Sequence, residues 1–161
     1  MDFFSPRKRK KHILHRGEFM KIVPSADSGA LHYVLDDGRI IKTLKLGEHI
    51  SDMVQKANTV FAAVYHENKI VKVENECIVS QVYSKYFPQR IIVGDDVFAL
   101  FTDGEYCFLE KFDTGLNREG VLKILFDFYS FDFFEKRILL SGETYVYLLD
   151  ENLKILRLFI K

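Results

Sequence analysis

Histidine and cysteine are the residues of this sequence with the widest chemical range, and both are few. The histidines are His12, His15, His32, His49 and His66, and the cysteines are Cys77 and Cys107. A metal site needs ligands that converge, commonly through closely spaced pairs, and neither set has that spacing. Neither cysteine has a neighbouring histidine or basic residue that would favour its thiolate. We therefore expect free thiols, no metal and no cofactor.

Adjacent carboxylates occur at Asp36-Asp37 and at Asp95-Asp96. Two carboxylates that face each other can share acid and base roles, but neighbours in a turn do not face each other through spacing alone. Aspartate also caps turns through its own side chain, which explains both pairs. The sequence contains no Walker loop, nucleophile elbow or zinc-protease motif. It predicts a non-catalytic protein, and an enzyme whose site is assembled from loops without a motif is the alternative.

Basic residues give the clearest chemical signal, in the stretch SPRKRKKH from Ser5 to His12. The cations of this leader are Arg7, Lys8, Arg9, Lys10, Lys11 and Arg16. Such a cluster contacts nucleic-acid phosphates without sequence preference, and the run RKRKK resembles a short nuclear localisation signal. We predict nuclear-import or nucleic-acid contacts for residues 7–16, and a merely solvated tail is the alternative.

The segment Ser5-Pro6-Arg7-Lys8 resembles the consensus of cyclin-dependent kinases, a Ser-Pro followed by a basic residue. A phosphate on Ser5 would add up to about two negative charges beside five positive ones. Phosphorylation would therefore weaken binding to an import receptor or to nucleic acid. Ser5 is the phosphorylation candidate, and the chain is predicted to be a phosphoprotein.

Charge is unevenly distributed, although the formal net charge is zero. The chain has 23 basic and 23 acidic residues, and residues 1–16 contain six of the basic residues and one of the acidic residues. The remaining 17 bases and 22 acids leave residues 17–161 with a net charge near −5. A body of that charge repels phosphates, so nucleic-acid binding is expected to depend on the basic leader.

The composition is that of a globular protein rich in β-strands. Of the 161 residues, 48% are hydrophobic and 29% are charged, with 15 phenylalanines and only 3 prolines. Aromatic side chains pack well in strands, and proline interrupts them. No apolar stretch reaches the length of a membrane span, and no signal peptide opens the chain. We expect no membrane partner and an intracellular protein, nuclear in preference to cytoplasmic.

A repeat of strand, turn and strand runs through residues 17–161. VFAAVYHENKIVKVEN from Val60 and VFALFTDGEYCFLEKF from Val97 stand 37 residues apart. A later copy contains GETYVYLLD, which is similar in pattern to GEYCFLEKF. An earlier, incomplete copy is GALHYVLDDGRIIKTLKL. Each complete unit holds about four strand candidates separated by turn residues such as Asp103-Gly104. These patterns predict an all-β protein of antiparallel four-stranded repeats of about 37–39 residues.

This strand rhythm resembles the blades of a β-propeller of the WD-repeat kind. The resemblance covers residues 17–161 and rests on rhythm alone, since the Gly-His and Trp-Asp signatures are missing. We divide the chain into a flexible basic leader, residues 1–16, and one domain with units at about 17–47, 48–84, 85–126 and 127–161. The first unit lacks a clear inner or outer strand. We therefore expect a small or partial propeller, with a β-sandwich or barrel as the alternative.

Phenylalanine is concentrated in the stretch ILFDFYSFDFF, residues 124–134. Two consecutive strands that bury rings on both faces of a sheet explain this concentration. The alternative is an exposed patch that binds a partner, because aromatic residues dominate interface hot spots. The partner-binding candidates are Phe128, Tyr129, Phe131 and Phe133.

Together these features favour a non-catalytic protein-interaction module that scaffolds a larger, nuclear assembly. Its expected partners are other proteins, including one that completes an open propeller through unpaired strand edges. The alternative is a nucleic-acid-associated factor of RNA processing, the ribosome or chromatin, anchored by residues 7–16.

Overall fold

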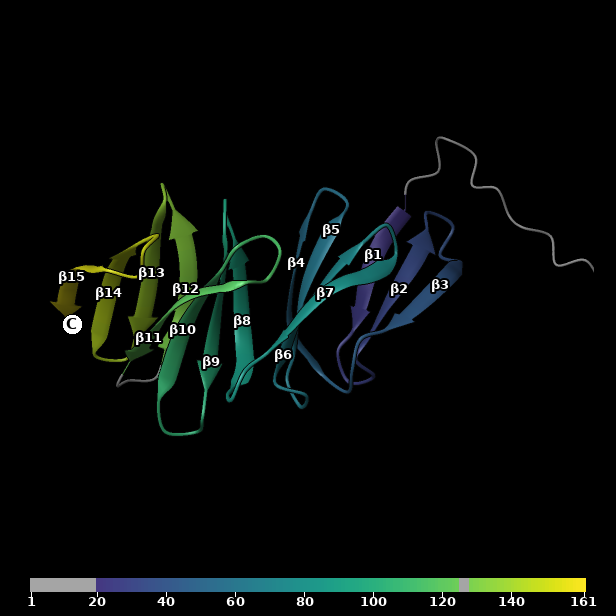
Figure 1. Cartoon of the computed structure of the whole chain (residues 1–161). Helices are drawn as coiled ribbons and strands as arrows, with labels where there is room; N and C mark the ends of the chain where they lie inside the picture. Colours follow the sequence, from purple (N-terminus) through teal and green to yellow (C-terminus); the bar gives the residue numbers. More distant parts are fainter. Residues whose placement is uncertain (1–19, 125–127) are drawn as a thin grey trace, which may run out of the picture.

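The computed structural model describes residues 20–124 and 128–161, and these residues form strands and turns without a helix (Figure 1). The described part accordingly has no helix with the length and apolar character needed to cross a bilayer. Its strands lie in four antiparallel sheets, each built from strands that follow one another along the chain. The prediction of an all-β protein of antiparallel repeats is confirmed. The alternative of a sandwich or barrel is wrong, because the strands form four separate sheets.

The first sheet has three strands, and the other three sheets have four each. The first sheet contains β1 (Met20–Ser25), β2 (Ala30–Leu35) and β3 (Ile40–Lys45). The second contains β4 (Ile50–Lys56), β5 (Thr59–Val64), β6 (Lys69–Glu74) and β7 (Cys77–Tyr83). The third contains β8 (Phe87–Val93), β9 (Val97–Thr102), β10 (Cys107–Phe112) and β11 (Arg118–Ile124). The fourth contains β12 (Phe128–Phe134), β13 (Arg137–Gly142), β14 (Tyr145–Asp150) and β15 (Ile155–Ile160).

The strands in the middle of each sheet differ from the outer strands in composition, and burial explains the difference. β5 reads TVFAAV and β9 reads VFALFT, and almost every residue of both strands is buried. A strand packed on both faces has no solvent side, so it is apolar throughout instead of alternating. The outer strands β7 and β11 expose most of their residues and carry serine, glutamine, arginine and lysine.

Irregularities in strand pairing recur at equivalent places and identify the strand that the first sheet lacks. In the second, third and fourth sheets the register shifts between the first and second strands, at Ile50/Asp52, Pro88/Arg90 and Phe128/Ser130. The pairing of β1 with β2 has no such shift and matches the regular pairing of β5 with β6. The pairing of β2 with β3 shifts after Tyr33, as that of β6 with β7 shifts after Lys72. Because β1, β2 and β3 match second, third and fourth strands, the strand that the first sheet lacks among the described residues is the inner one.

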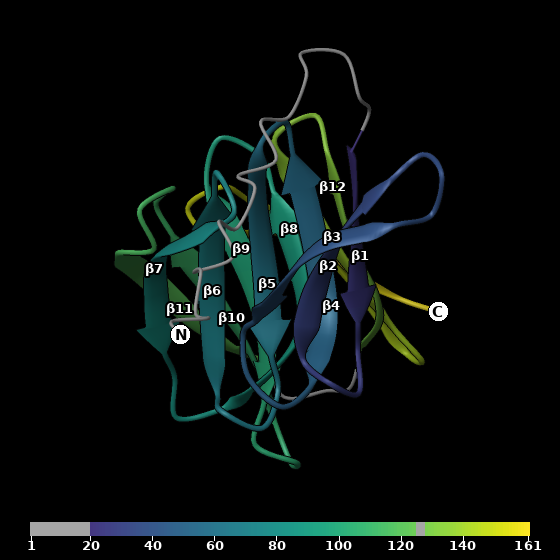
Figure 2. The same cartoon turned by 90° about the vertical axis from the view of Figure 1, so that its right-hand side faces the viewer.

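The four sheets stack face to face in sequence order, and each seam between neighbours is an apolar core (Figures 1 and 2). The first strand of a sheet packs against the preceding sheet, as β8 does against β4 and β5. Leu31 and Val71 share the first seam, Phe61 and Phe101 the second, and Phe98 with Ile138, among others, the third. The sheets therefore form an open arc with a described neighbour on both sides of the two middle sheets only.

One buried carboxylate joins the second and third sheets. Glu110 on β10 is only 2% exposed. It accepts a hydrogen bond from Ser84 Oγ at 2.9 Å and pairs with Arg118 Nε at 2.7 Å. A buried charge is tolerated when it is paired and hydrogen-bonded, so these contacts make Glu110 part of the packed seam.

Candidate protein-interaction surface

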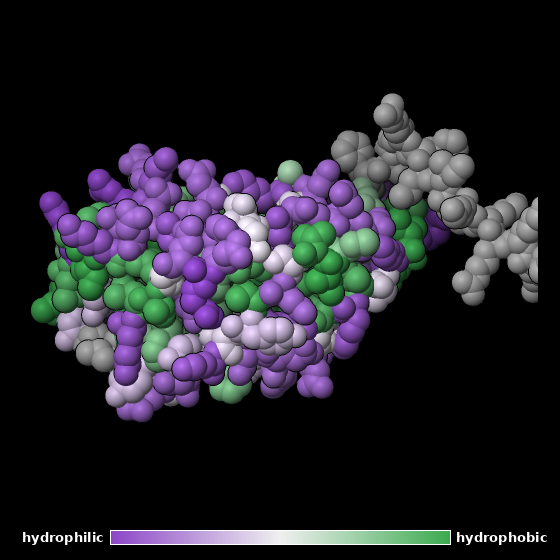
Figure 3. Space-filling view, in the orientation of Figure 1, coloured by the Kyte–Doolittle hydropathy of each residue, from purple (hydrophilic) through white to green (hydrophobic). Residues whose placement is uncertain are grey.

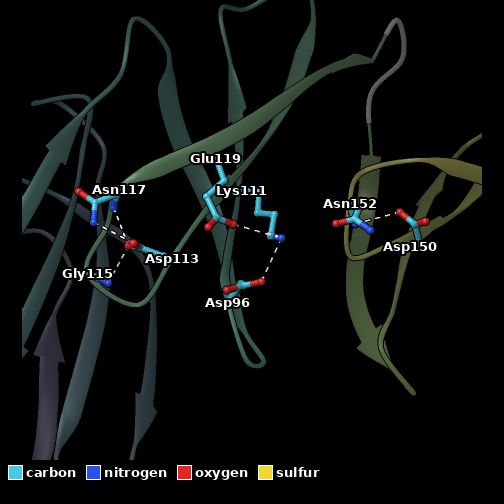
Figure 4. A network of polar contacts seen from close by, with 8 residues as sticks. All are labelled: Asp96, Lys111, Asp113, Gly115, Asn117, Glu119, Asp150 and Asn152. Atoms are coloured by element: carbon cyan, nitrogen blue, oxygen red, sulfur yellow. Dashed lines mark hydrogen bonds and ion pairs between the residues drawn. The ribbon is translucent and has the colours of Figure 1, made fainter.

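Two aspartates, Asp113 and Asp150, form hydrogen bonds within the turns in which they lie. Asp113 accepts hydrogen bonds from the backbone N–H groups of Gly115 and Asn117 and from the Asn117 side chain (Figure 4). Asp150 accepts from the backbone N–H of Asn152 in the same manner. These contacts are the usual turn chemistry of aspartate, whose carboxylate accepts hydrogen bonds from the backbone of its own turn.

Three of the four residues in the two adjacent aspartate pairs form ion pairs, namely Asp37, Asp95 and Asp96. Asp37 pairs with Arg39 Nε at 2.5 Å and accepts a hydrogen bond from the Arg39 backbone N–H. Asp96 lies 3.1 Å from Lys111 Nζ, which also pairs with Glu119 at 3.2 Å (Figure 4). Asp95 pairs with Lys136 at 3.6 Å, and both side chains are exposed.

Acid should destabilise the fold through these turns. Hydrogen bonds from the Asn117 side chain and then from its backbone hold the pKa of Asp113 below its ordinary value. The backbone N–H of Arg39 lowers the pKa of Asp37 in the same direction. A carboxyl whose pKa is depressed in the folded state stabilises the fold above its unfolded pKa, and that stability is lost as the pH falls through the folded pKa. The melting temperature is therefore expected to drop below about pH 4.

Asp113→Asn isolates one contribution to this pH dependence. The amide does not titrate, so the variant should lose less melting temperature between pH 7 and pH 3 than the original chain. Thermal unfolding followed by circular dichroism at both pH values gives the comparison. An equal loss in both proteins would show that Asp113 contributes nothing to the acid sensitivity.

Some of the other predicted site residues lie outside the described residues, and the rest belong to β12. Ser5 and the leader cations, Arg7, Lys8, Arg9, Lys10, Lys11 and Arg16, lie outside the described residues. Phe128, Phe131 and Phe133 are half-buried against the third sheet, with the Phe133 ring 5.9 Å from that of Phe98. Tyr129 belongs to the same strand, β12. The role of these four residues in partner binding stays a prediction.

His32, His49 and His66 stand 17 residues apart in the sequence. Two of them, His49 and His66, meet at the edge of the stack where β5 ends, the lower edge in Figure 1. His49 and His66 have ring centroids 5.8 Å apart. Tyr65 contacts both histidines, at 6.1 Å from His49 and 5.2 Å from His66, and stacks on Phe87 at 5.1 Å. We call these four residues the edge cluster. It joins the second sheet to the third through Phe87, the first residue of β8.

Charged side chains of both signs surround the edge cluster. A hollow of about 450 Å³ is lined by His49, His66, Asp27, Lys45 and Glu48. His49 Nδ1 lies 4.0 Å from Asp27 Oδ1. Next to His66, Glu67 pairs with Lys69 at 2.5 Å, and Lys69 Nζ lies 5.8 Å from the ring centroid of the exposed Tyr83. Exposed rings within a mixed charged rim are the usual make-up of a protein-binding surface.

A second hollow, of about 460 Å³, lies between the first two sheets at the opposite edge. Its lining includes Tyr33, Gln55, Asn58 and Glu76. The Tyr33 hydroxyl is buried and has no hydrogen-bond partner among the described residues. Burial, followed by the Glu76 carboxylate, raises the pKa of Tyr33, so the phenol stays protonated. The lining thus offers the hydrogen-bonding groups of Gln55 and Asn58 beside the Glu76 carboxylate.

Neither hollow holds a metal site, since no three histidine, cysteine or acidic side chains converge within residues 20–124 and 128–161. Cys77 is exposed and Cys107 is buried, and no disulfide joins them. The spacing of His49 and His66 was the only sequence signal of the edge cluster. Tyr65 and Phe87 carried no signal of their own, because their contact depends on how neighbouring sheets stack.

Consecutive four-stranded antiparallel sheets, stacked face to face in an open arc, define a partial β-propeller. Comparison with solved structures bears this out. The chain superposes on BBS1N in complex with ARL6DN with a TM-score of 0.68 at 10% identity. It superposes on BamB from Moraxella catarrhalis with a TM-score of 0.69 and on the Pan2 WD40 domain of Neurospora crassa with 0.65, each at 11% identity. The predicted propeller resemblance is therefore confirmed.

These superpositions cover most of this chain but only half of each relative. They cover 88% of this chain and 51% of BBS1N, 88% and 48% for BamB, and 83% and 47% for the Pan2 domain. The chain thus spans about half the length of the propellers that it resembles. No protein-family model and no curated protein sequence matches it.

Proposed function

We propose that the chain is a non-catalytic interaction module that binds a protein segment on the edge cluster and scaffolds a larger, nuclear assembly. The observation that supports this most is the contact of His49, Tyr65, His66 and Phe87 in one group, of which His66 and Phe87 are exposed, beside charges of both signs. Aromatic groups of this kind are the usual anchors of protein interfaces. BBS1N, a propeller of the same fold, was solved in complex with ARL6DN, which fits a partner-binding role.

A paired substitution tests this surface. The tagged chain is purified from its native cells, and the proteins that accompany it are quantified by mass spectrometry. Phe87→Ala and His66→Ala each remove a ring of the edge cluster and should reduce the recovery of the main partner about tenfold or more. Phe134→Ala removes an exposed ring that lies far from the cluster along the chain, on the last sheet, and should change nothing. Equal recovery with all three variants would contradict the proposal, provided that each variant melts like the original chain.

Nuclear residence is the part of the proposal that depends on the basic leader. Deletion of residues 1–16 should move the protein to the cytoplasm while recovery of the protein partner is unchanged. Ser5→Asp places a negative charge beside the cations and should have the same direction of effect. Unchanged localisation in both variants would reduce the leader to a solvated tail.

The nucleic-acid alternative is favoured by one observation, the six cations within residues 1–16. If the leader binds RNA or DNA, its removal should abolish binding, and the affinity of the full chain should fall steeply with salt. The log–log slope should decrease by about one unit per removed cation. Binding that survives the deletion would locate the nucleic-acid contacts on the acidic body instead.

A further inference from the structure

The two ends of the arc expose the two faces that a propeller blade normally covers with its neighbours. The last sheet, β12–β15, packs one face on the third sheet and leaves the other face free of described neighbours. The free face carries Leu139, Val146, Leu148 and Phe159, of which Phe159 is 47% exposed. Figure 3 shows apolar side chains gathered at this end of the molecule, on the left. Monomeric proteins rarely leave such a face open.

The first sheet, β1–β3, has the opposite arrangement. It packs Leu31 and Tyr33 against the second sheet, and the face with Val23, His32 and Val34 is free of described neighbours (Figure 2). The free face of the last sheet is thus the face that, in the other sheets, packs against the following sheet. The free face of the first sheet is the face that, in the other sheets, packs against the preceding sheet. The two ends are complementary and do not duplicate each other.

A repeated contact shows how a following sheet is held. In each sheet the outermost strand pairs with the strand before it, and the register of this pairing shifts once. The outermost-strand residues that pair directly before this shift occupy one equivalent position: Lys42, Ser80, Gly120 and Arg157. Lys42 Nζ donates to the backbone oxygen of Glu76 at 2.9 Å and to its carboxylate at 3.1 Å. Ser80 Oγ donates to the Gly115 oxygen at 2.7 Å. Each of these contacts reaches the turn between the third and fourth strands of the following sheet.

Arg157 is the last member of this series, and the described residues contain no following sheet against which it could pack. It is exposed and has no ion-pair or hydrogen-bond partner among the described residues. The corresponding turn of a first sheet lies between β2 and β3 and contains Asp36 and Asp37. Asp37 is paired with Arg39, whereas Asp36 has no partner among the described residues. A cation without a partner therefore corresponds in position to a carboxylate without one.

We propose that two copies of the chain close head to tail into one ring, with the last sheet of each copy on the first sheet of the other. Arg157 of each copy then pairs with Asp36 of the other, as Lys42 pairs with Glu76 inside the chain. Two arcs of this extent together match one propeller of the kind that this arc resembles, because each superposition covers about half of the relative. A twofold arrangement makes both junctions identical and closes the ring, so no apolar end remains.

Each junction differs from the interior seams in one respect. The inner strand of the first sheet is absent from the described residues, so the contact rests on β13–β15 of one copy and on β1–β3 of the other. The inference does not depend on the proposed function, since no residue of the edge cluster belongs to the strands β13–β15 or β1–β3 that form the junctions.

Charge reversal in solution tests the junction. Sedimentation of the full chain should give twice its mass of 18.9 kDa. Arg157→Asp and Asp36→Arg each place like charges at both junctions and should each weaken dimerisation at least about tenfold. An equimolar mixture of the two variants restores opposite charges at both junctions and should again give a dimer. Lys85→Asp, a reversal at an exposed loop position, serves as the control and should leave the dimer unchanged.

The outcomes separate this arrangement from its competitors. A chain that remains a monomer at its highest soluble concentration would overturn the proposal. A dimer that both single variants leave intact would also overturn it and would point to a face-to-face contact of two last sheets. Assemblies that grow beyond two copies with concentration would exclude ring closure. Because Arg157 and Asp36 are exposed and have no partner within residues 20–124 and 128–161, all variants should keep the circular dichroism spectrum of the original protein.

Discussion

Replacement of Phe98 by alanine is expected to lower the free energy of unfolding by about 3–5 kcal/mol. Phe98 is fully buried on β9 and faces the last sheet, where its ring lies 5.9 Å from that of Phe133. The substitution removes apolar surface from the third seam and leaves a cavity between two rigid sheets. Each sheet contacts only its neighbours, so no other part of the chain can fill that cavity.

Urea unfolding followed by circular dichroism measures this loss, and Phe134→Ala is the matched control. Phe134 follows Phe133 on β12 but is 70% exposed. Its removal should therefore change the free energy of unfolding by less than about 0.5 kcal/mol. Similar effects of the two substitutions would mean that the third and fourth sheets do not pack through Phe98.

Gly29→Ala is expected to cost about 2–4 kcal/mol, since strain and overlap add. Gly29 lies in the turn between β1 and β2 with a φ of 60°, a left-handed conformation that side chains disfavour. A Cβ there would overlap the backbone carbonyl of Gly47. The Gly29 oxygen also accepts hydrogen bonds from the N–H groups of Leu46 and Gly47 at 2.9 and 3.2 Å, so the two segments cannot separate without breaking these bonds.

Gly38→Ala separates the two causes. Gly38 also has a positive φ, of 83°, but nothing lies within 4 Å of the position that a Cβ would take. Its substitution should cost only the conformational penalty, about 1–2 kcal/mol. Both losses are read from the same urea unfolding curves. If Gly29→Ala cost no more than Gly38→Ala, the close approach of Gly47 would contribute nothing to stability.

Side-chain contacts between sheets were beyond sequence reasoning even where the residues had been noticed. His49 and His66 stood out by spacing, but only the stacking of sheets brings Tyr65 and Phe87 to them. The residue types of Phe131 and Phe133 suit a buried seam and an exposed patch equally well. The sequence therefore did not predict which face of β12 packs against another sheet. Ser141 and Gly142 have typical turn residue types but lie at the end of β13. Glu135 and Lys136 do not, yet both adopt positive φ in the hairpin turn between β12 and β13.

The sequence by itself determined the strands, their antiparallel order and the repeat, because alternation and turn chemistry act between residues a few positions apart. Only the tertiary structure decided that the strand the first sheet lacks among the described residues is the inner one, since that assignment depends on pairing register. The same holds for the equivalence of Arg157 with Lys42. These relations join residues one or more repeats apart, and their contacts arise from stacked sheets instead of local periodicity.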